Sequence, residues 1–411
     1  MALNPDSPEL QAWIRLNLEP ALKAEHLRLL LSIFGLPQDI CAASTGSLAR
    51  YVDPRIAARL GQPPDEDQQE RIARTLDWLR GPDRALLTLA DPDYPQVLLQ
   101  LDDPPAVLFA HGRLEILRHP AIAMVGARSA TQGGVENAQA FAQFLAGRGW
   151  CIVSGLASGI DAAAHEGALM AGPAGGGTLA VLGTGIDRVY PPANRDLAHR
   201  IAEQGLLLSE FPLGTPGLRF NFPRRNRLVA ALAKGVLVVE AARRSGSLIT
   251  ARLAGELGRE VFAIPGSIHS PLAHGCHALI RQGAKLVESG QDILEELQQD
   301  ALPGTGAPAW AAQSAPDDES TAPPSRHSAP QARHESRPES IPEEAFQVLV
   351  QALGYDPVGL DTLQARTGWD TGALLHRLTL MELSGLLTQQ PDGRYARSGG
   401  QDPRARPAPA L

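Results

Sequence analysis

Cysteine is scarce in this chain of 411 residues, which contains only Cys41, Cys151 and Cys276. Three scattered cysteines do not suit a disulfide framework, and no Cys-x-x-Cys pair indicates a zinc ribbon. The N-terminus lacks the unbroken apolar stretch of a signal peptide, because Asp6 and Glu9 interrupt it. No later segment is long and apolar enough to cross a bilayer. These absences predict a cytoplasmic protein with reduced thiols and no membrane partner.

Net positive charge is also lacking, since the formal net charge is -8. Such a balance argues against a protein that coats nucleic acid with its entire surface. One stretch departs from this average, because residues 211–239 contain no Asp or Glu. Its cationic residues are Arg219, Arg224, Arg225, Arg227 and Lys234. Any basic site is therefore expected in this stretch, which we call the acid-free segment.

Apolar spacing predicts an α/β protein with a helical N-terminal part. Residues 1–80 place apolar residues such as Leu27 and Leu30 at helical spacing, which predicts a small helical domain. From residue 81 onward, helical stretches alternate with the buried-strand runs AIAMVG, WCIVSG, TLAVLG, GVLVVEA and EVFAIPG. Strict alternation of strand and helix predicts a Rossmann-like, doubly wound parallel sheet over residues 81–297.

The composition changes after the predicted sheet. Residues 298–340 are rich in Pro, Ser, Ala and Gly and cannot bury enough apolar area to fold, which predicts a disordered linker. Residues 341–397 regain helical periodicity, and Asp392-Gly393 predicts a hairpin turn. Three helices followed by a hairpin are typical of a winged-helix domain. Residues 398–411 are expected to form a disordered tail.

Glycine-containing turns follow two neighbouring strand runs and suit an anion. In AIAMVGARSATQGG the strand ends at Gly126, and Arg128 could clasp a phosphate beside a helix N-terminus. In CIVSGLASGID, Ser154 and Gly155 follow the next strand and allow close approach of a phosphate. Two such loops would form one anion-binding crevice. A plain strand-to-helix turn with a solvated arginine is the alternative. The glycines do not fit GxGxxG, so no dinucleotide cofactor is expected.

Arginines and phenylalanines alternate in LRFNFPRRNRLVAALA, within the acid-free segment. Arg224, Arg225 and Arg227 could neutralise phosphates while Phe222 stacks on bases, an arrangement that suits single-stranded nucleic acid. Duplex DNA would not offer its base faces. The alternative places the aromatic rings in the core and leaves the arginines solvated, because phenylalanine is usually buried.

A third turn rich in hydrogen-bond donors follows the strand GVLVVEA. It contains Ser245, Gly246 and Ser247 in ARRSGSLITA. Because the strands are expected to be parallel, all three turns should lie at one edge of the sheet. Three phosphate-suited loops at one edge favour a polymeric anion.

Two clusters of titratable residues suggest catalysis or metal binding only weakly. Asp161 and His165 lie four residues apart on a predicted helix, but no nucleophile accompanies them, so we interpret them as a structural pair. The second cluster consists of His269, His274, Cys276 and His277. Its spacing matches none of the usual zinc patterns, and a tight surface turn is the preferred interpretation. We therefore predict no catalytic residue and no metal ion.

The region from about residue 80 to 295 resembles the DNA processing protein A (DprA/Smf) family throughout. The resemblance rests on ordered motifs: VGARSATQGG, SGLASGIDAAAHEGAL, VLGTGIDRVYPPANRDL, SEFPLGTP, NFPRRNRLVAALA, VVEAARRSGSLITARLA, VFAIPGS and HGCHALIRQGA. It implies a homodimer that binds single-stranded DNA, protects incoming strands during natural transformation and loads the RecA recombinase. No reaction and no cofactor are implied. The helical N-terminal region and the winged helix are similar to the family's accessory domains.

The resemblance also implies which residues face DNA. They are Gly126, Arg128, Ser154, Gly155, Arg224, Arg225, Arg227, Ser245, Gly246 and Ser247. Phe222 joins this set as the predicted stacking residue.

Two other functions stay open at this point. Rossmann-like enzymes of the lysine-decarboxylase-like (LOG) type cleave nucleotide N-glycosidic bonds and carry a PGGxGTxxE segment with a catalytic Glu. The comparable place here reads RRSGSLITA, which lacks the acid and the second glycine pair. Alternatively, the winged helix could be a sequence-specific regulator, since residues 367–380 could form a helix-turn-helix. Only His376 and Arg377 would then reach DNA, which favours a protein contact.

Overall fold

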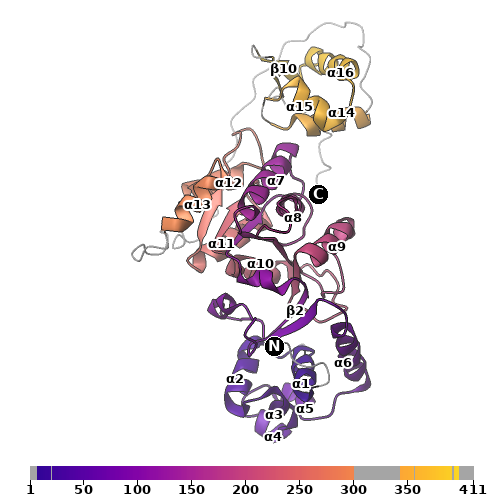
Figure 1. Cartoon of the computed structure of the whole chain (residues 1–411), viewed down its shortest axis with the longest axis vertical. Coiled ribbons are helices and arrows are strands. Elements are labelled where there is room, and N and C mark those ends of the chain that lie inside the picture. The colour runs from indigo at the N-terminus through magenta and orange to yellow at the C-terminus, as the bar shows by residue number, and fades with distance from the viewer. Residues whose placement is uncertain (1–6, 20, 300–342, 356, 391–392, 398–411) are drawn as a thin grey trace, which may run out of the picture. The chain divides into compact units, whose positions relative to one another are not determined.

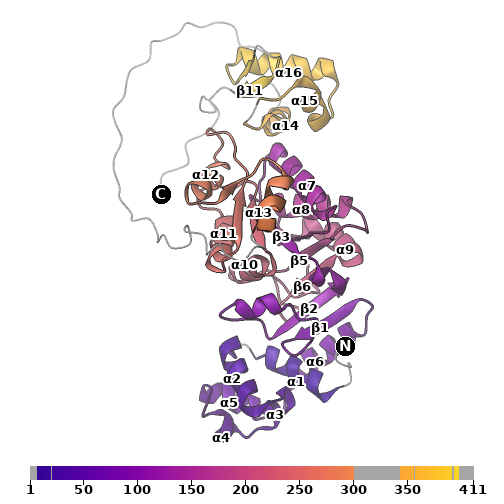
Figure 2. The ribbon, with the colours of Figure 1, turned by 60° about the vertical axis from the view of Figure 1, so that its left-hand side comes forward.

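The computed structural model describes residues 7–19, 21–299, 343–355, 357–390 and 393–397. The chain divides into two compact units. The first contains the N-terminal helices and the large sheet, and the second contains the C-terminal helices and hairpin (Figures 1 and 2). Each unit has its own hydrophobic core. None of the described helices has both the length and the apolar character needed to cross a membrane.

Short helices cover the N-terminal part, as the apolar spacing predicts. They are α1 (Pro8–Asn17), α2 (Ala24–Phe34), α3 (Pro37–Ala42), α4 (Thr45–Leu48), α5 (Pro54–Leu60) and α6 (Glu66–Leu79). Side-chain caps define several starts: Asp53 caps α5 and Asp65 caps α6, each by accepting a backbone N–H. Proline occupies the first position of α5, where its missing N–H costs nothing.

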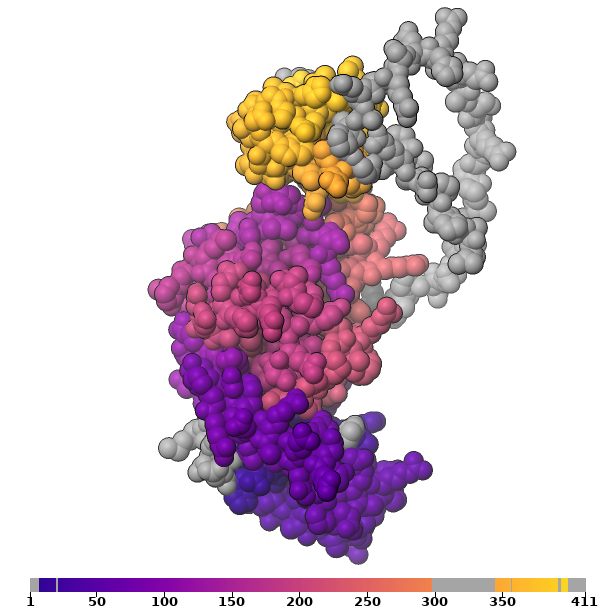
Figure 3. All heavy atoms as spheres, turned by 90° about the vertical axis from the view of Figure 1, so that its right-hand side faces the viewer, coloured from indigo at the N-terminus to yellow at the C-terminus, as the bar shows by residue number. Residues whose placement is uncertain are grey.

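These helices share a core with the sheet. Leu10, Ile14 and Leu30 belong to the same buried cluster as Val107 and Phe109 of the sheet. The space-filling view shows the helices packed directly against the rest of this unit (Figure 3). The boundary between residues 80 and 81 stays a prediction, because no separate core marks it.

The central sheet has nine strands in the order β1-β2-β6-β5-β4-β3-β7-β8-β9. The strands are β1 (Arg84–Thr88), β2 (Val107–Gly112), β3 (Ala121–Val125), β4 (Cys151–Ser154), β5 (Thr178–Val181), β6 (Leu206–Ser209), β7 (Gly235–Val238), β8 (Glu260–Ala263) and β9 (Lys285–Leu286). The seven neighbouring strands β6-β5-β4-β3-β7-β8-β9 all pair in parallel, which confirms the predicted doubly wound sheet. Strands β1, β2, β6 and β9 lie outside the five predicted runs, and β1 and β2 form an antiparallel pair with no long helix between them.

Helices cover both faces of the parallel sheet. They are α7 (Gln132–Ala146), α8 (Ile160–Met170), α9 (Arg195–Gln204), α10 (Asn221–Leu232), α11 (Gly246–Glu256), α12 (His274–Arg281) and α13 (Gly290–Gln299), with the 3-10 turns η1 (Gln96–Gln100), η2 (Leu114–Arg118) and η3 (Pro192–Asn194). Alternate residues of β3 point to opposite faces, so Ala123 packs with α10 and α11 whereas Ile122 packs with α7 and α8.

Strand β3 lies at the topological switch point. The chain leaves β3 through α7 to reach β4 on one side, and β7 pairs with β3 on the other side. The loops that follow β3 and β7 therefore diverge to opposite faces, which leaves a crevice beyond the carboxyl ends of the strands.

The second unit has the winged-helix order of elements. It contains α14 (Glu343–Leu353), α15 (Leu360–Thr367), α16 (Thr371–Leu383) and the antiparallel strands β10 (Leu387–Gln389) and β11 (Tyr395–Arg397). Leu363, Leu374 and Leu378 form the centre of its core. Helix α13 extends two residues into the predicted linker. The rest of that linker, Asp392 of the predicted turn and the predicted tail lie outside the described residues.

Candidate nucleic-acid interface

A pocket of about 170 Å³ opens at the carboxyl ends of β3, β4 and β7. We call it the switch-point pocket. It is lined by Val125, Gly126, Arg128, Ala157, Asp161, Phe222, Arg225, Asn226, Ser245, Gly246, Ser247 and Thr250. The structure thus brings together residues from the three predicted loops and from the acid-free segment, although these are far apart in the sequence.

Arg225 forms the buried floor of this pocket. It extends from α10, only 5% of its surface is exposed, and its Nη1 lies 3.9 Å from Asp161 Oδ2. Asp161 Oδ2 also accepts hydrogen bonds from the backbone N–H groups of Gly155 (3.1 Å) and Ala157 (3.3 Å). Burial raises the pKa of Asp161, and the charge of Arg225 opposes that rise. Among the described residues, Arg225 Nε has no hydrogen-bond partner.

Gly155 admits the guanidinium group. A Cβ atom at this residue would coincide with the guanidinium of Arg225. The sequence interpretation assigned this glycine to close approach of a phosphate. In the structure, the space beside Gly155 is filled by Arg225, and the Gly155 N–H donates to Asp161.

Ser154 and Gly126 contribute to packing between strands and helices. Ser154 has no exposed surface, and its hydroxyl donates to the carbonyl oxygen of Met124 at 2.6 Å. It therefore ties β4 to β3 and presents no group to a ligand. A Cβ at Gly126 would lie 2.6 Å from the side chain of Ile160, so glycine lets α8 approach the end of β3.

Two predicted DNA-facing arginines are paired with acids from other segments. Arg227 Nη2 lies 2.6 Å from Glu210 Oε2, and Arg227 Nε lies 3.3 Å from Asp103 Oδ1. Arg224 also contacts Glu210, at 3.0 Å. Glu210 is buried and directly precedes the acid-free segment. Arg227 is consequently 8% exposed, whereas about half of the Arg224 side chain remains accessible.

Arg128 is the exposed cation of the switch-point pocket. Its guanidinium carbon lies 5.8 Å from the ring centroid of Phe222, within the range of a cation–π contact. The Phe222 ring lies in turn 5.3 Å from the ring of Tyr190. Tyr190 is 48% exposed, and it is not among the residues predicted from the sequence. The motif VYPPAN contains this tyrosine but does not indicate that it packs against Phe222.

The N-terminus of α11 borders the pocket. Ser245 caps this helix by accepting from the Ser247 N–H at 3.3 Å, and Gly246 is exposed at its first position. Backbone N–H groups at a helix N-terminus attract anions. The exposed Arg243 and Arg244, which directly precede Ser245, add positive charge and were not selected from the sequence.

The Asp161–His165 pairing was wrong. His165 is fully buried, and its Nδ1 lies 2.7 Å from Thr178 Oγ1, so its partner is on β5 rather than on its own helix. Burial lowers the pKa of His165 to about 3, which keeps the imidazole neutral at physiological pH.

The predicted surface turn does not include all residues of the histidine-cysteine cluster. Cys276 lies in the core, with its Sγ 3.6 Å from the Val238 carbonyl oxygen, and burial raises its pKa to about 12. His277 Nε2 lies 3.0 Å from the Gly266 carbonyl oxygen. In the described parts of the chain, no three His, Cys, Asp or Glu side chains gather closely enough to hold a metal ion.

The fold and this pocket define a Rossmann-like protein with a crevice at the switch point of the sheet and an additional winged-helix domain. Residues 85–298 match the family model of DNA recombination-mediator protein A, and residues 330–393 match the DprA winged helix domain. The chain belongs to the DprA/Smf family.

Individual relatives agree with this assignment. Protein Smf of Escherichia coli is 39% identical over 330 residues, which cover 80% of this chain and 81% of that protein. DNA processing protein DprA of Streptococcus pneumoniae is 49% identical over 211 residues, covering 51% and 73%. The X-ray structure of DNA processing protein A from Streptococcus pneumoniae superimposes with a TM-score of 0.61 at 38% identity, covering 72% of this chain and 99% of that one.

Proposed function

We propose that this protein binds single-stranded DNA at the switch-point pocket and performs no chemistry on it. One observation carries the proposal: the exposed guanidinium of Arg128 lies over the half-buried ring of Phe222, beside the N-terminus of α11. A cation and a helix N-terminus suit a phosphate, and an accessible aromatic ring suits an unpaired base. Duplex DNA would satisfy only the first of these requirements.

A nucleotide-hydrolysing enzyme is the weaker candidate. The carboxylate of Asp161 lies beneath the pocket and is engaged by Arg225 and two backbone N–H groups. His165 has no exposed surface from which to transfer a proton to a ligand. The hydroxyls of Ser245 and Ser247 contact each other at 2.6 Å. This arrangement supports binding, because a nucleophile activated by an adjacent base is not found among the described residues that line the pocket.

The biological part of the proposal rests on family membership. As a homodimer in the cytoplasm, the protein would bind incoming single strands, protect them during natural transformation and load the RecA recombinase onto them. The winged helix would then serve as a protein contact. Its helix α16 carries His376 and Arg377, and the guanidinium of Arg377 lies 4.4 Å from the ring centroid of Trp369. That contact leaves few cationic groups on α16 for DNA.

Fluorescence anisotropy with labelled oligothymidine, alone or annealed to oligoadenine, tests the proposal. The single strand should bind more tightly than the duplex at equal salt, because only the single strand exposes base faces. Equal affinity for both forms would contradict the stacking role of Phe222. Turnover of a nucleoside monophosphate that is abolished by Asp161→Asn would contradict the absence of chemistry.

A further inference from the structure

A second, larger pocket lies at the same edge of the sheet. Its volume is about 410 Å³, and it opens between the loops that follow β5 and β6. Its lining residues are Thr184, Asp187, Arg188, Val189, Tyr190, Pro192, Arg195, His199, Pro216 and Gly217. We call it the Arg195 pocket. Because β3 to β7 are parallel strands, it opens on the same side of the sheet as the switch-point pocket.

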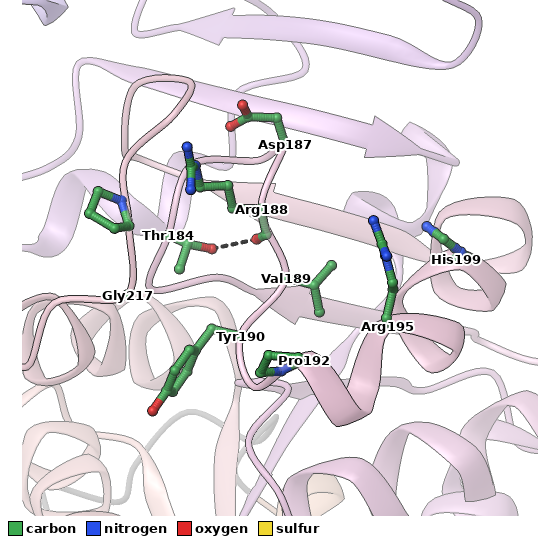
Figure 4. Close-up of a pocket in the computed structure, with 10 residues that line it drawn as sticks. Thr184, Asp187, Arg188, Val189, Tyr190, Pro192, Arg195, His199 and Gly217 are labelled. Atoms are coloured by element: carbon green, nitrogen blue, oxygen red, sulfur yellow. Dashed lines mark hydrogen bonds between the residues drawn. The ribbon is translucent and has the colours of Figure 1, made fainter.

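The Arg195 pocket carries uncompensated positive charge. Arg188 and Arg195 are exposed, and neither guanidinium has an acidic partner among the described residues. Figure 4 shows these two side chains on either side of Val189, with His199 one turn beyond Arg195 on α9. The hydroxyl of Thr184 donates to the Arg188 carbonyl oxygen at 2.6 Å and so holds the loop that presents Arg188.

The one carboxylate in the lining does not cancel this charge. Asp187 Oδ2 lies 3.3 Å from Arg74 Nη2 of helix α6, and Asp187 Oδ1 accepts the Gly214 N–H at 2.7 Å. The negative charge of Asp187 is therefore neutralised by a cation outside the pocket. The balance around the pocket remains positive, which suits an anionic ligand.

An aromatic pair connects the two pockets. Phe222 lines the switch-point pocket and Tyr190 lines the Arg195 pocket, and their ring centroids are 5.3 Å apart. Gly217 supports this arrangement, because a Cβ there would lie 3.1 Å from the Tyr190 ring. The order along the sheet edge is therefore cation, ring, ring, cation: Arg128, Phe222, Tyr190, then Arg188 with Arg195. A single strand offers two successive bases that can stack on the two rings, and phosphates on either side of those two bases that can reach the two cationic pockets.

We propose that the Arg195 pocket is a second phosphate subsite for the same DNA strand, reached across Phe222 and Tyr190. This inference rests on the proposed single-strand binding and extends it. A strand long enough to reach both pockets gains contacts that a short strand cannot make. The binding footprint is therefore set by two cationic pockets, and affinity should rise with strand length until both are filled.

The test compares oligothymidines of increasing length with the full-length protein, using anisotropy at several salt concentrations. The double variant Arg188→Gln/Arg195→Gln should bind long strands roughly a hundredfold more weakly, at about tenfold for each charged contact. The slope of log affinity against log salt should flatten by about 0.7 for each lost phosphate contact. The shortest strands, which fill only the switch-point pocket, should bind both proteins equally.

Arg200→Gln is the matched control. Arg200 is an exposed arginine on the same helix α9, but it pairs with Glu166 at 3.3 Å and does not line the pocket. This variant should retain wild-type affinity and salt slope. A loss as large as that of the double variant would show that the charge of α9 acts nonspecifically, and would overturn the subsite.

Two further outcomes separate the inference from the proposed function. If Arg128→Ala weakens binding at every length while Arg188→Gln/Arg195→Gln changes nothing, the second subsite is wrong and single-strand binding stands. If neither change affects any strand, both are wrong. Thymidine 5′-monophosphate is the probe for a separate small-anion site. Direct binding of that nucleotide, lost in the double variant while long-strand affinity is unchanged, would also overturn the subsite.

Discussion

The guanidinium group of Arg225 occupies the space that a side chain at Gly155 would need. Asp161 contacts both residues: its carboxylate accepts a hydrogen bond from the Gly155 N–H and lies 3.9 Å from the guanidinium of Arg225. The loop after β4 and the helix α10 are thereby locked together beneath the switch-point pocket. The buried guanidinium is therefore held in place by contacts within the protein itself.

Gly155→Ala should displace Arg225 and destabilise the protein. A methyl group in a filled site costs about 1 to 3 kcal/mol of unfolding free energy, and the displaced guanidinium should also weaken single-strand binding. Chemical denaturation and anisotropy measure the two effects. Gly46→Ala is the control, because a Cβ there would meet nothing within 4 Å. Unchanged stability of Gly155→Ala would show that Arg225 moves aside without cost.

Arg225→Ala should unfold more easily rather than only bind DNA less well. Removing this arginine leaves Asp161 buried without its cation, and breaking a buried ion pair costs about 3 to 5 kcal/mol. Urea denaturation followed by circular dichroism measures this loss. The double change Arg225→Met/Asp161→Asn, which removes both charges, should recover much of the lost stability. A single variant as stable as the wild type would contradict the pairing.

Arg128→Ala and Phe222→Ala should weaken single-strand binding in distinguishable ways. Each should lose about 1 to 3 kcal/mol of binding free energy. Only Arg128→Ala should flatten the salt slope, by about 0.7, because only the arginine displaces a counterion from a phosphate. Titrations by anisotropy at several salt concentrations measure both quantities, and circular dichroism checks folding. Equal slopes for the two variants would mean that Arg128 does not contact a phosphate.

Acid should destabilise the protein in part through His165. Its pKa is 6.5 in the unfolded reference and about 3 in the fold, so the unfolded state binds a proton first as pH falls. Above about pH 6.5, His165 therefore adds no pH dependence to the free energy of unfolding. That free energy decreases as the pH falls from 6.5 toward 3, by up to about 1.4 kcal/mol per pH unit. Urea denaturation between pH 7 and about pH 5 measures the slope. His165→Gln should reduce it, whereas His269→Gln, at an exposed site, should not.

Removal of residues 300–411 should leave single-strand affinity unchanged. Every residue that lines the switch-point pocket or the Arg195 pocket belongs to the first compact unit, which has its own cores. Anisotropy with the shortened and full-length proteins at equal salt makes the comparison. A large loss on truncation would require the winged helix to share the DNA site.

Local patterns were enough to predict most elements of the fold. The parallel strands β3 to β8 are short and almost entirely buried, because both faces of such a sheet are covered by helices. The three glycine-containing turns could be placed at one edge of the sheet, because each follows a strand and the strands are parallel. Strands β1 and β2 were not predicted, since an antiparallel pair without an intervening helix lacks the alternation of strand and helix.

The candidate site was predictable only in part. Arg128 and Phe222 were identified from residue type and position. Ser154 looked equally suitable, yet its hydroxyl is used between β3 and β4. Tyr190 was overlooked, because nothing in its local sequence indicates the contact with Phe222.

The sequence by itself determined the alternation of parallel strands with helices, the winged helix and the presence of a cationic, aromatic segment. Only the tertiary structure decided which of its arginines are buried beside acids and which are exposed. Glu210 and Asp103 neutralise Arg227, and Asp161 holds Arg225, although none of these acids lies in the acid-free segment. The pattern of charges along the chain shows which residues are close in sequence, whereas ion pairs form between residues that are close in space. The fold brings distant acids within 4 Å and leaves Arg128 exposed.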